Sequence, residues 1–161
     1  MKICSFTGHR RIVPSHEKKL CELLCRAVKY AYDNGCRKFI AGGAVGFDTL
    51  AAREVIKFRI SHPDVSLVLA LPCVNQDENW TGAQRDAYSY TLSVADEVIY
   101  ISEEYTETCM KERNRSLAEE ADILVAYVSR YASGAGQTVR MAKALGKQVY
   151  NLYPALSGAI K

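Results

Sequence analysis

The sequence predicts a doubly wound, three-layer α/β domain, with a mainly parallel sheet of about six strands. Strand-like and helix-like hydrophobic periodicities alternate along all 161 residues, without a repeat, a low-complexity segment or a long linker. Several strand segments are also apolar on both faces, as in residues 66–71 and 123–126, which is typical of parallel strands between two helical layers. We therefore expect a single domain over residues 1–161, with right-handed connections.

The individual elements follow from these periodicities. The clearest helix covers residues 16–33, where Leu20, Leu24 and Val28 share one stripe, with Ser15 as the expected N-cap and Gly35 as the stop. Strands are expected at residues 2–6, 38–41, 66–71, 97–101, 123–128 and 148–152, and further helices at 47–59, 83–94, 106–121 and 137–145.

Composition limits the classes of function. The formal net charge of +3, from 21 Lys and Arg against 18 Asp and Glu, is too small for a dedicated nucleic-acid binder, so nucleic acid is not an expected partner. No run of about 18 apolar residues and no secretory leader is present, so we expect a cytoplasmic protein without a membrane partner. The six cysteines form no Cys-x-x-Cys pair and have no His at zinc-finger spacing, which favours reduced, structural thiols and no metal site.

Three glycine-bearing turns stand where an expected strand is followed by an expected helix. Such turns meet at the carboxyl edge of a parallel sheet, where the strand order reverses and ligands bind. Backbone N–H groups at a helix start attract anions, so the turns together predict a site for an anionic, nucleotide-like ligand. The residues expected to bind it are Thr7, Gly8, His9 and Arg10 in the first turn, Gly42, Gly43, Gly46 and Asp48 in the second, and Gly134, Gly136 and Thr138 in the third.

Each turn also has an alternative interpretation. Asp48 is either a structural acid in the first turn of a helix or an acceptor for a ribose hydroxyl. His9 either contacts a phosphate or satisfies nearby backbone groups, with the adjacent arginines solvated. The third turn is either a phosphate site or a flexible connection. The second turn lacks both the strict dinucleotide spacing and the Lys-Ser/Thr of a P-loop, which argues against kinases and NTPases.

Two further segments offer contacts to a base and a phosphate. Gln76 and Trp80 lie in a polar loop after the third strand and suit a base edge and a base face, although a lone Trp is more often a packing anchor. On the helix at 106–121, Arg113 borders the face of Met110 and Asn114, whereas Arg115 points about 200° away from Arg113. Arg113 is therefore the expected ligand contact and the candidate catalytic residue, with a surface charge as the alternative.

These motifs resemble the YpsA-like branch of the SLOG superfamily, which is related to the LOG (lysine-decarboxylase-like) phosphoribohydrolases and to the Rossmann-like core of DprA. The resemblance implies a Rossmann-like fold and a bound nucleotide or nucleotide-derived ligand, without implying a particular reaction. The segments that carry it span nearly the whole chain: Thr7-Gly8-His9-Arg10, residues 42–49, Pro72-Cys73 with Gln76 and Asn79-Trp80, Ala95-Asp96, Tyr105, Cys109-Met110 with Arg113-Asn114-Arg115, and the late glycine turn.

The LOG relatives imply hydrolysis of the bond between a base and ribose 5-monophosphate, through a Met-x-x-Arg-Lys motif and a later glutamate. Met110 and Arg113 match the first motif with Asn114 in place of the lysine, but Met141 stands where the glutamate belongs. A thioether cannot replace a carboxylate in this chemistry. A relocated acid would have to come from elsewhere in the chain, and the candidates are Asp48, Glu78 and Glu112.

The leading hypothesis is therefore a protein that binds an ADP-ribose-, NAD- or nucleoside-monophosphate-like ligand, as a sensor or regulator, with no cofactor firmly implied. The first alternative is a nucleoside 5′-monophosphate phosphoribohydrolase, and the second is DprA-like nucleic-acid binding. Analogy with the LOG relatives also suggests a homodimer.

Overall fold

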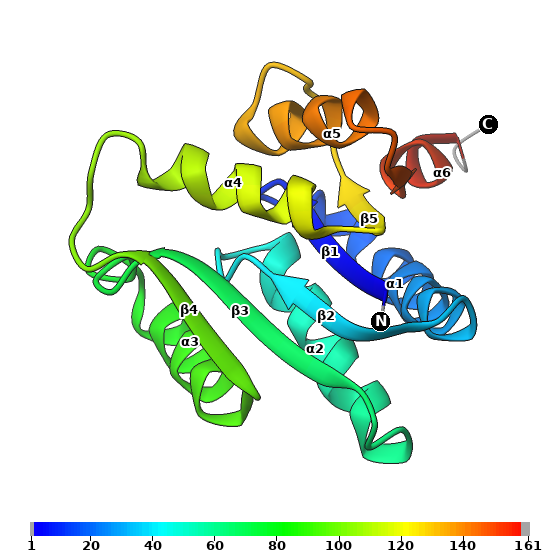
Figure 1. Cartoon of the computed structure of the whole chain (residues 1–161), viewed down its shortest axis with the longest axis horizontal. Helices are drawn as coiled ribbons and strands as arrows, with labels where there is room; N and C mark the ends of the chain where they lie inside the picture. The colour runs from blue at the N-terminus through cyan, green and yellow to red at the C-terminus, as the bar shows by residue number, and fades with distance from the viewer. Residues whose placement is uncertain (1, 159–161) are drawn as a thin grey trace.

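The computed structural model describes residues 2–158 and contains an all-parallel sheet of six strands in the order β4-β3-β2-β1-β5-β6 (Figure 1). The α/β Rossmann-like class predicted from the sequence is confirmed, and every predicted strand is present to within two residues at each end. The strands are β1 Lys2–Gly8, β2 Cys36–Ala41, β3 Ser66–Cys73, β4 Glu97–Ser102, β5 Ile123–Tyr127 and β6 Gln148–Asn151.

The strand order reverses beside β1, which pairs with β2 on one side and with β5 on the other. Chain connections after β1 and after β5 therefore leave the sheet in opposite directions, and a crevice opens at the carboxyl ends of these two strands. The register places Thr7 opposite Ala126 and Gly8 opposite Tyr127, so the two strands end at the same level.

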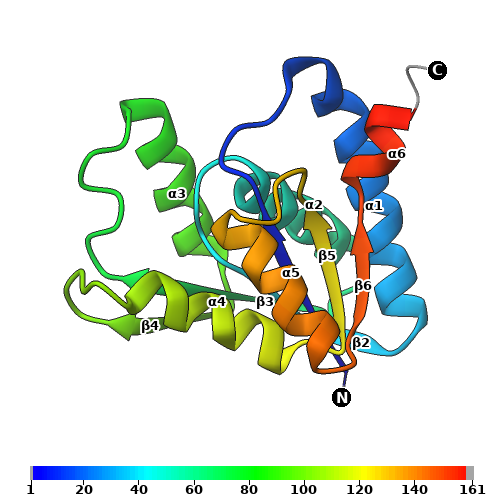
Figure 2. The ribbon, with the colours of Figure 1, turned by 90° about the horizontal axis from the view of Figure 1, so that it is seen from above.

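Helices cover both faces of the sheet (Figure 1). The helices α1 Glu17–Asp33, α2 Phe47–Ser61 and α3 Gly82–Val94 lie on one face, and α4 Cys109–Glu120 and α5 Gly134–Ala144 lie on the other. A 3-10 turn, Pro14–His16, precedes α1, and the short helix α6 Tyr153–Gly158 lies beside the start of α1 (Figure 2).

The core divides between the two faces. The larger cluster joins β1 to β3 with α1 and α2 through fully buried side chains such as Phe6, Phe39 and Leu69. A smaller cluster packs β5 against α4 and α5 through Leu124 and Val139. Burial of the strands on both sides explains why their sequences are apolar on both faces.

Two helices start three residues away from the predicted position, and one predicted cap is not formed. The helix expected at Gln137 begins at Gly134, because the Oγ of Ser133 accepts the N–H of Gly136 at 3.0 Å and makes the glycine turn the first turn of α5. The helix expected at Thr106 begins at Cys109. Ser15 does not cap α1, because Pro14 starts a 3-10 turn that contains it.

No helix within residues 2–158 combines the length and the apolar character that crossing a membrane requires.

Candidate functional site

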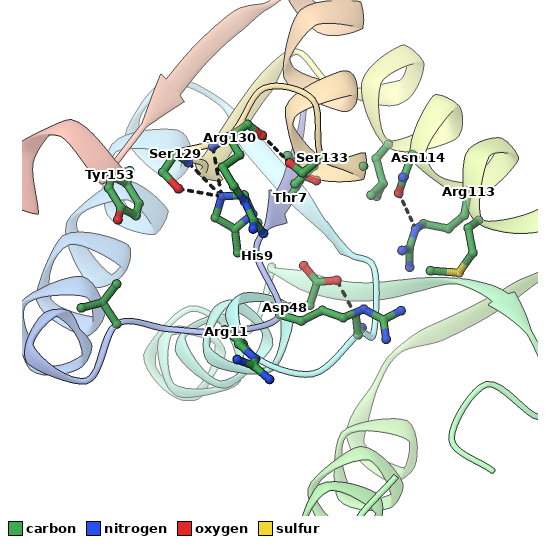
Figure 3. Close-up of a pocket in the computed structure, with 18 residues that line it drawn as sticks. Thr7, His9, Arg11, Asp48, Arg113, Asn114, Ser129, Arg130, Ser133 and Tyr153 are labelled. Carbon is green, nitrogen blue, oxygen red and sulfur yellow. Dashed lines mark hydrogen bonds between the residues drawn. The ribbon is translucent and has the colours of Figure 1, made fainter. Parts of the chain in front are cut away.

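A cavity of about 580 Å³ lies at the carboxyl edge of the sheet, where β1 and β5 end (Figure 3). The loops after β1 and β5, the first turns of α2, α5 and α6, and one side of α4 from Met110 to Leu117 surround it. Its lining residues are Thr7, Gly8, His9, Arg10, Arg11, Val13, Ala44, Asp48, Met110, Arg113, Asn114, Leu117, Ser129, Arg130, Ser133, Gly134, Ala135 and Tyr153.

The lining is strongly cationic. Arg10, Arg11, Arg113 and Arg130 contribute four guanidinium groups, and Asp48 is the one carboxylate among the described residues that line the cavity. The lining residues thus carry a formal excess of positive charge equal to the net charge of +3 of the whole chain, and this local concentration is suited to an anion.

The backbone of His9 joins the two sides of the crevice. Its N–H donates to the carbonyl of Tyr127 at the end of β5 at 3.1 Å, and its carbonyl accepts the N–H of Phe47 at the start of α2 at 3.2 Å. The loop after β1 is thereby held between β5 and α2, which places Arg10 and Arg11 at the cavity.

The imidazole of His9 holds the loop after β5. Its Nε2 accepts the N–H of Ser129 at 2.8 Å and lies 3.2 Å from the Oγ of the same residue. Because Nε2 is an acceptor, the neutral ring carries its proton on Nδ1. Burial, and then the charge of Arg130, lower the pKa of His9. The imidazole therefore satisfies backbone groups, as in the second of the two interpretations of the sequence, while still lining the cavity.

The first turn of α5 presents backbone donors to the cavity. Ser133 caps the helix, and its carbonyl accepts the N–H of Gln137 at 2.9 Å. The N–H groups of Gly134 and Ala135 precede the first intrahelical hydrogen bond, and both residues line the cavity. These groups and the positive end of the helix dipole favour a negative ligand group.

Arg113 enters the cavity from α4 and is only 4% exposed. Its Nη1 donates to the carbonyl oxygen of Gly42, and its Nε donates to the Oδ1 of Asn114 at 2.9 Å. Burial lowers the pKa of Arg113, and the nearby carboxylate of Asp48 opposes that shift. Arg115 is exposed and does not line the cavity.

Asp48 lies in the first turn of α2 and is 5% exposed. Its Oδ2 accepts the N–H of Ala44 at 3.2 Å, and its Oδ1 has no hydrogen-bond partner within residues 2–158. Burial raises the pKa of Asp48 to about 6, although the charge of Arg113 and the bond from Ala44 act in the opposite direction. Asp48 therefore titrates close to neutral pH.

Most glycines of the turns serve the protein's own packing. A Cβ on Gly8 would lie 2.4 Å from the ring of Phe47, and one on Gly136 would lie 2.4 Å from the Cα of Tyr131. Gly43 and Gly46 have φ angles of +72° and +80°, which favour glycine. Gly42, Gly43, Gly46 and Gly136 are not in the cavity lining, whereas Gly134 and Ala135 are, so the glycine turn that presents its backbone to the cavity beside that of Gly8 is the first turn of α5.

Three other predicted ligand contacts also lie outside the cavity lining. Trp80 packs edge-on against Tyr88, with ring centroids 5.0 Å apart. The Nε2 of Gln76 donates to the carbonyl of Gly43 at 3.1 Å, and the Oγ1 of Thr138 donates to the carbonyl of Gly134 within α5 at 2.9 Å. These side chains support the loops and helices around the site.

The structure also brings in residues that the sequence analysis did not propose, chiefly Ser129, Arg130 and Tyr153. In Figure 3, Tyr153 and Arg113 lie at opposite ends of the cavity, with His9 and Ser133 between them. Ser129, Arg130 and Tyr153 could have been predicted from their position directly after the fifth and sixth strands, because chain segments at that point reach the ligand edge of a doubly wound sheet.

Of the three proposed relocated acids, only Asp48 lines the cavity. Met141, at the position of the LOG glutamate, packs against the smaller core cluster on α5. The site thus contains one carboxylate, on α2 rather than on α5.

The fold and the cavity define a Rossmann-like protein with a cationic cavity at the point where the strand order reverses. Residues 14–154 match the YspA SLOG family (YpsA), and the chain belongs to this family. It is 30% identical over 147 residues to the uncharacterized SPbeta prophage-derived protein YoqJ of Bacillus subtilis (strain 168), covering 83% of this chain and 82% of YoqJ. It is also 30% identical over 135 residues to UPF0398 protein BCB4264_A1614 of Bacillus cereus (strain B4264), covering 78% of this chain and 73% of the relative.

Solved structures with the same fold include two DNA processing proteins A (DprA). The Streptococcus pneumoniae protein has a TM-score of 0.65 at 16% identity, over 92% of this chain and 49% of DprA. The Helicobacter pylori protein has a TM-score of 0.63 at 18% identity, over 92% of this chain and 63% of DprA. The structure of TM1055 has a TM-score of 0.57 at 18% identity, over 98% and 81% of the two chains. This chain thus spans about half to two thirds of the DprA chains, and these likenesses concern the fold.

Proposed function

We propose that the protein binds a nucleotide or nucleotide-derived ligand, with its phosphate groups in the cavity between β1 and β5, as a sensor or regulator. The observation that carries this proposal is the charge of the lining: four arginines and the first turn of α5 face a cavity that holds a single carboxylate. Arginine binds phosphate oxygens in pairs, and a helix start adds backbone donors to the same group.

The size of the cavity agrees with such a ligand. Its volume of about 580 Å³ lies within the usual range for small-molecule sites. The apolar lining residues Val13, Met110 and Leu117 offer contact surface beside the charged groups, as a base or sugar requires.

A thermal-shift screen against ADP-ribose, NAD, AMP and cyclic nucleotides tests the proposal. Binding at concentrations well above Kd raises the melting temperature, and no stabilisation by any of them at about 1 mM would contradict it. Arg130→Gln should abolish the shift, whereas Arg140→Gln, an exposed arginine on α5 outside the lining, should leave it unchanged.

Single-stranded DNA belongs in the same screen, because the Helicobacter pylori DprA structure is described in terms of its single-stranded DNA binding mode. Retention on single-stranded DNA that falls steeply with salt would favour the nucleic-acid alternative over a small nucleotide.

Asp48 favours a second candidate function, hydrolysis of the bond between base and ribose in a nucleoside 5′-monophosphate. A carboxyl group whose pKa is raised to about 6 can exchange protons near neutral pH, and this one lies in the cavity beside Arg113. Incubation with a panel of nucleoside monophosphates at high protein concentration should then release free base, detected by chromatography. Release of base by the wild type, and its loss in Asp48→Asn, would support a hydrolase. No release would contradict hydrolysis, and ligand binding would be the remaining function.

A further inference from the structure

The Oδ1 of Asp48 is a buried acceptor at the wall of the cavity without a donor in residues 2–158. The other oxygen, Oδ2, is used by the N–H of Ala44. The hydrogen bonds of Arg113 go to Gly42 and Asn114 rather than to this oxygen. Buried polar atoms are nearly always hydrogen-bonded, so an orphaned carboxylate oxygen at a cavity indicates a missing donor.

The surroundings limit what that donor can be. A phosphate group would be repelled by a carboxylate, and the arginines are better partners for it. A Ca²⁺ or Mg²⁺ ion takes about six oxygen ligands, whereas Asp48 is the one carboxylate that the described lining offers and guanidinium groups surround it. A neutral O–H or N–H donor remains, which is water in the free protein and a group of the ligand once the ligand displaces that water.

A nucleotide offers two such groups, the hydroxyls of its ribose and an amino group of its base. Arg113 lies so close to Asp48 that a Cβ on Gly42 would be 2.7 Å from the Oδ2 of Asp48 and 2.8 Å from the Nη1 of Arg113. A phosphate drawn to Arg113 therefore brings its own sugar next to Asp48, because the ribose directly adjoins the phosphate while the base lies beyond it.

We propose that the Oδ1 of Asp48 accepts a hydrogen bond from a ribose hydroxyl and so selects ribonucleotides over deoxyribonucleotides and bare phosphates. The selection rests on the proposed function, since it concerns the same cavity. A hydrogen bond to a charged acceptor, left unmade in a deoxy analogue, reduces affinity by about 10-fold or more.

Equilibrium binding of AMP, 2′-deoxy-AMP, 3′-deoxy-AMP, IMP and inorganic pyrophosphate tests the proposal. The wild type should bind AMP and IMP alike and at least one deoxy form about 10-fold or more weakly. In Asp48→Ala this difference should disappear. Thr49→Ala is the matched control, because the Oγ1 of Thr49 donates to the carbonyl of Ala44 in the same turn at 3.1 Å but lies outside the lining of this cavity. The control should keep the full preference.

The outcomes separate this proposal from the general one. Equal affinity for AMP and both deoxy forms would overturn the ribose contact while leaving nucleotide binding intact. Weaker binding of IMP than of AMP, with no effect of the sugar, would assign Asp48 to the base instead. Binding of pyrophosphate alone would leave an anion site without sugar recognition, and no binding of any of these ligands up to about 1 mM would overturn both proposals.

Discussion

The Nη1 of Arg113 donates a hydrogen bond to the carbonyl oxygen of Gly42, which lies 71 residues earlier in the chain. This bond joins the first turns of α4 to the turn between β2 and α2, across the carboxyl edge of the sheet. It also holds a guanidinium group beside Asp48, in a setting where burial alone would disfavour both charges.

Replacing Arg113 should therefore affect stability as well as binding. In Arg113→Met the carbonyl of Gly42 loses its donor and Asp48 loses its nearest cation, so we expect a loss of about 1–3 kcal/mol in the free energy of unfolding. Urea denaturation followed by circular dichroism measures it. Arg115→Met, which removes an exposed arginine on the same helix, should change the stability by less than about 0.5 kcal/mol. Equal effects of the two substitutions would contradict the role given to Arg113.

His9→Ala should loosen the loop after β5. The substitution removes the acceptor of the part-buried hydrogen bond from the N–H of Ser129, so we expect a loss of about 0.5–1.5 kcal/mol in the free energy of unfolding. The pKa of His9 is lowered in the folded protein, so the unfolded chain takes up a proton as the pH falls through about 6.5 and the folded chain does not. The stabilisation is thus present above that pH and is lost below it. Urea denaturation at pH 7.5 and pH 5 should show a larger difference between wild type and variant at pH 7.5, and a constant difference would argue against a neutral, accepting imidazole.

Asp48 should give the opposite pH dependence. Its pKa is about 6 in the folded protein against an ordinary 3.8, so the folded state holds a proton that the unfolded state releases between these values. Stability from this group is full below about pH 4 and falls as the pH rises through 6, by roughly 3 kcal/mol in all. Asp48→Asn should therefore be more stable than the wild type at pH 7.5, with no such gain at pH 4. Melting temperatures of variant and wild type measured across this range check it, and a difference between the two proteins that stays constant from pH 4 to pH 7.5 would be inconsistent with a buried titrating Asp48.

Two glycine substitutions compare a glycine that is required by a close contact with one that has open space around it. Gly8→Ala would place a methyl group 2.4 Å from the ring of the fully buried Phe47, so we expect a loss of about 1–3 kcal/mol or more. Gly82→Ala, at the first position of α3, meets no heavy atom within 4 Å and should be neutral or stabilising by up to about 1 kcal/mol. Denaturation of both variants, side by side, measures the difference. Equal stabilities would contradict the close contact between Gly8 and Phe47.

Much of the fold follows from the sequence, because burial on two faces leaves a local signature. Residues 66–71 and 123–126 read as buried parallel strands and are found in β3 and β5. The start of α5 was misplaced, since the cap at Ser133 depends on its own hydroxyl accepting the N–H of Gly136 rather than on any hydrophobic period.

The site was predicted less completely. Thr7, His9, Arg10, Asp48 and Arg113 line the cavity because they follow strands or begin helices at the ligand edge. Gln76 and Trp80 also follow a strand, but β3 lies two strands from β1, and Trp80 packs against Tyr88 of α3 instead. Their residue types suited a base, whereas their place in the sheet kept them from the cavity lining.

The sequence by itself determined the order of strands and helices, the parallel class of the sheet, and the edge at which its glycine turns collect, because these depend on periodicity and on residue types within short segments. Only the tertiary structure decided that Arg130 and Tyr153 join the site, that His9 holds a loop, and that Asp48 lies buried with one oxygen unsatisfied. Burial and hydrogen bonding at the site depend on contacts between segments that are distant in the sequence, as between His9 and Ser129 with a separation of 120 and between Arg113 and Gly42 with a separation of 71, and no local pattern encodes them.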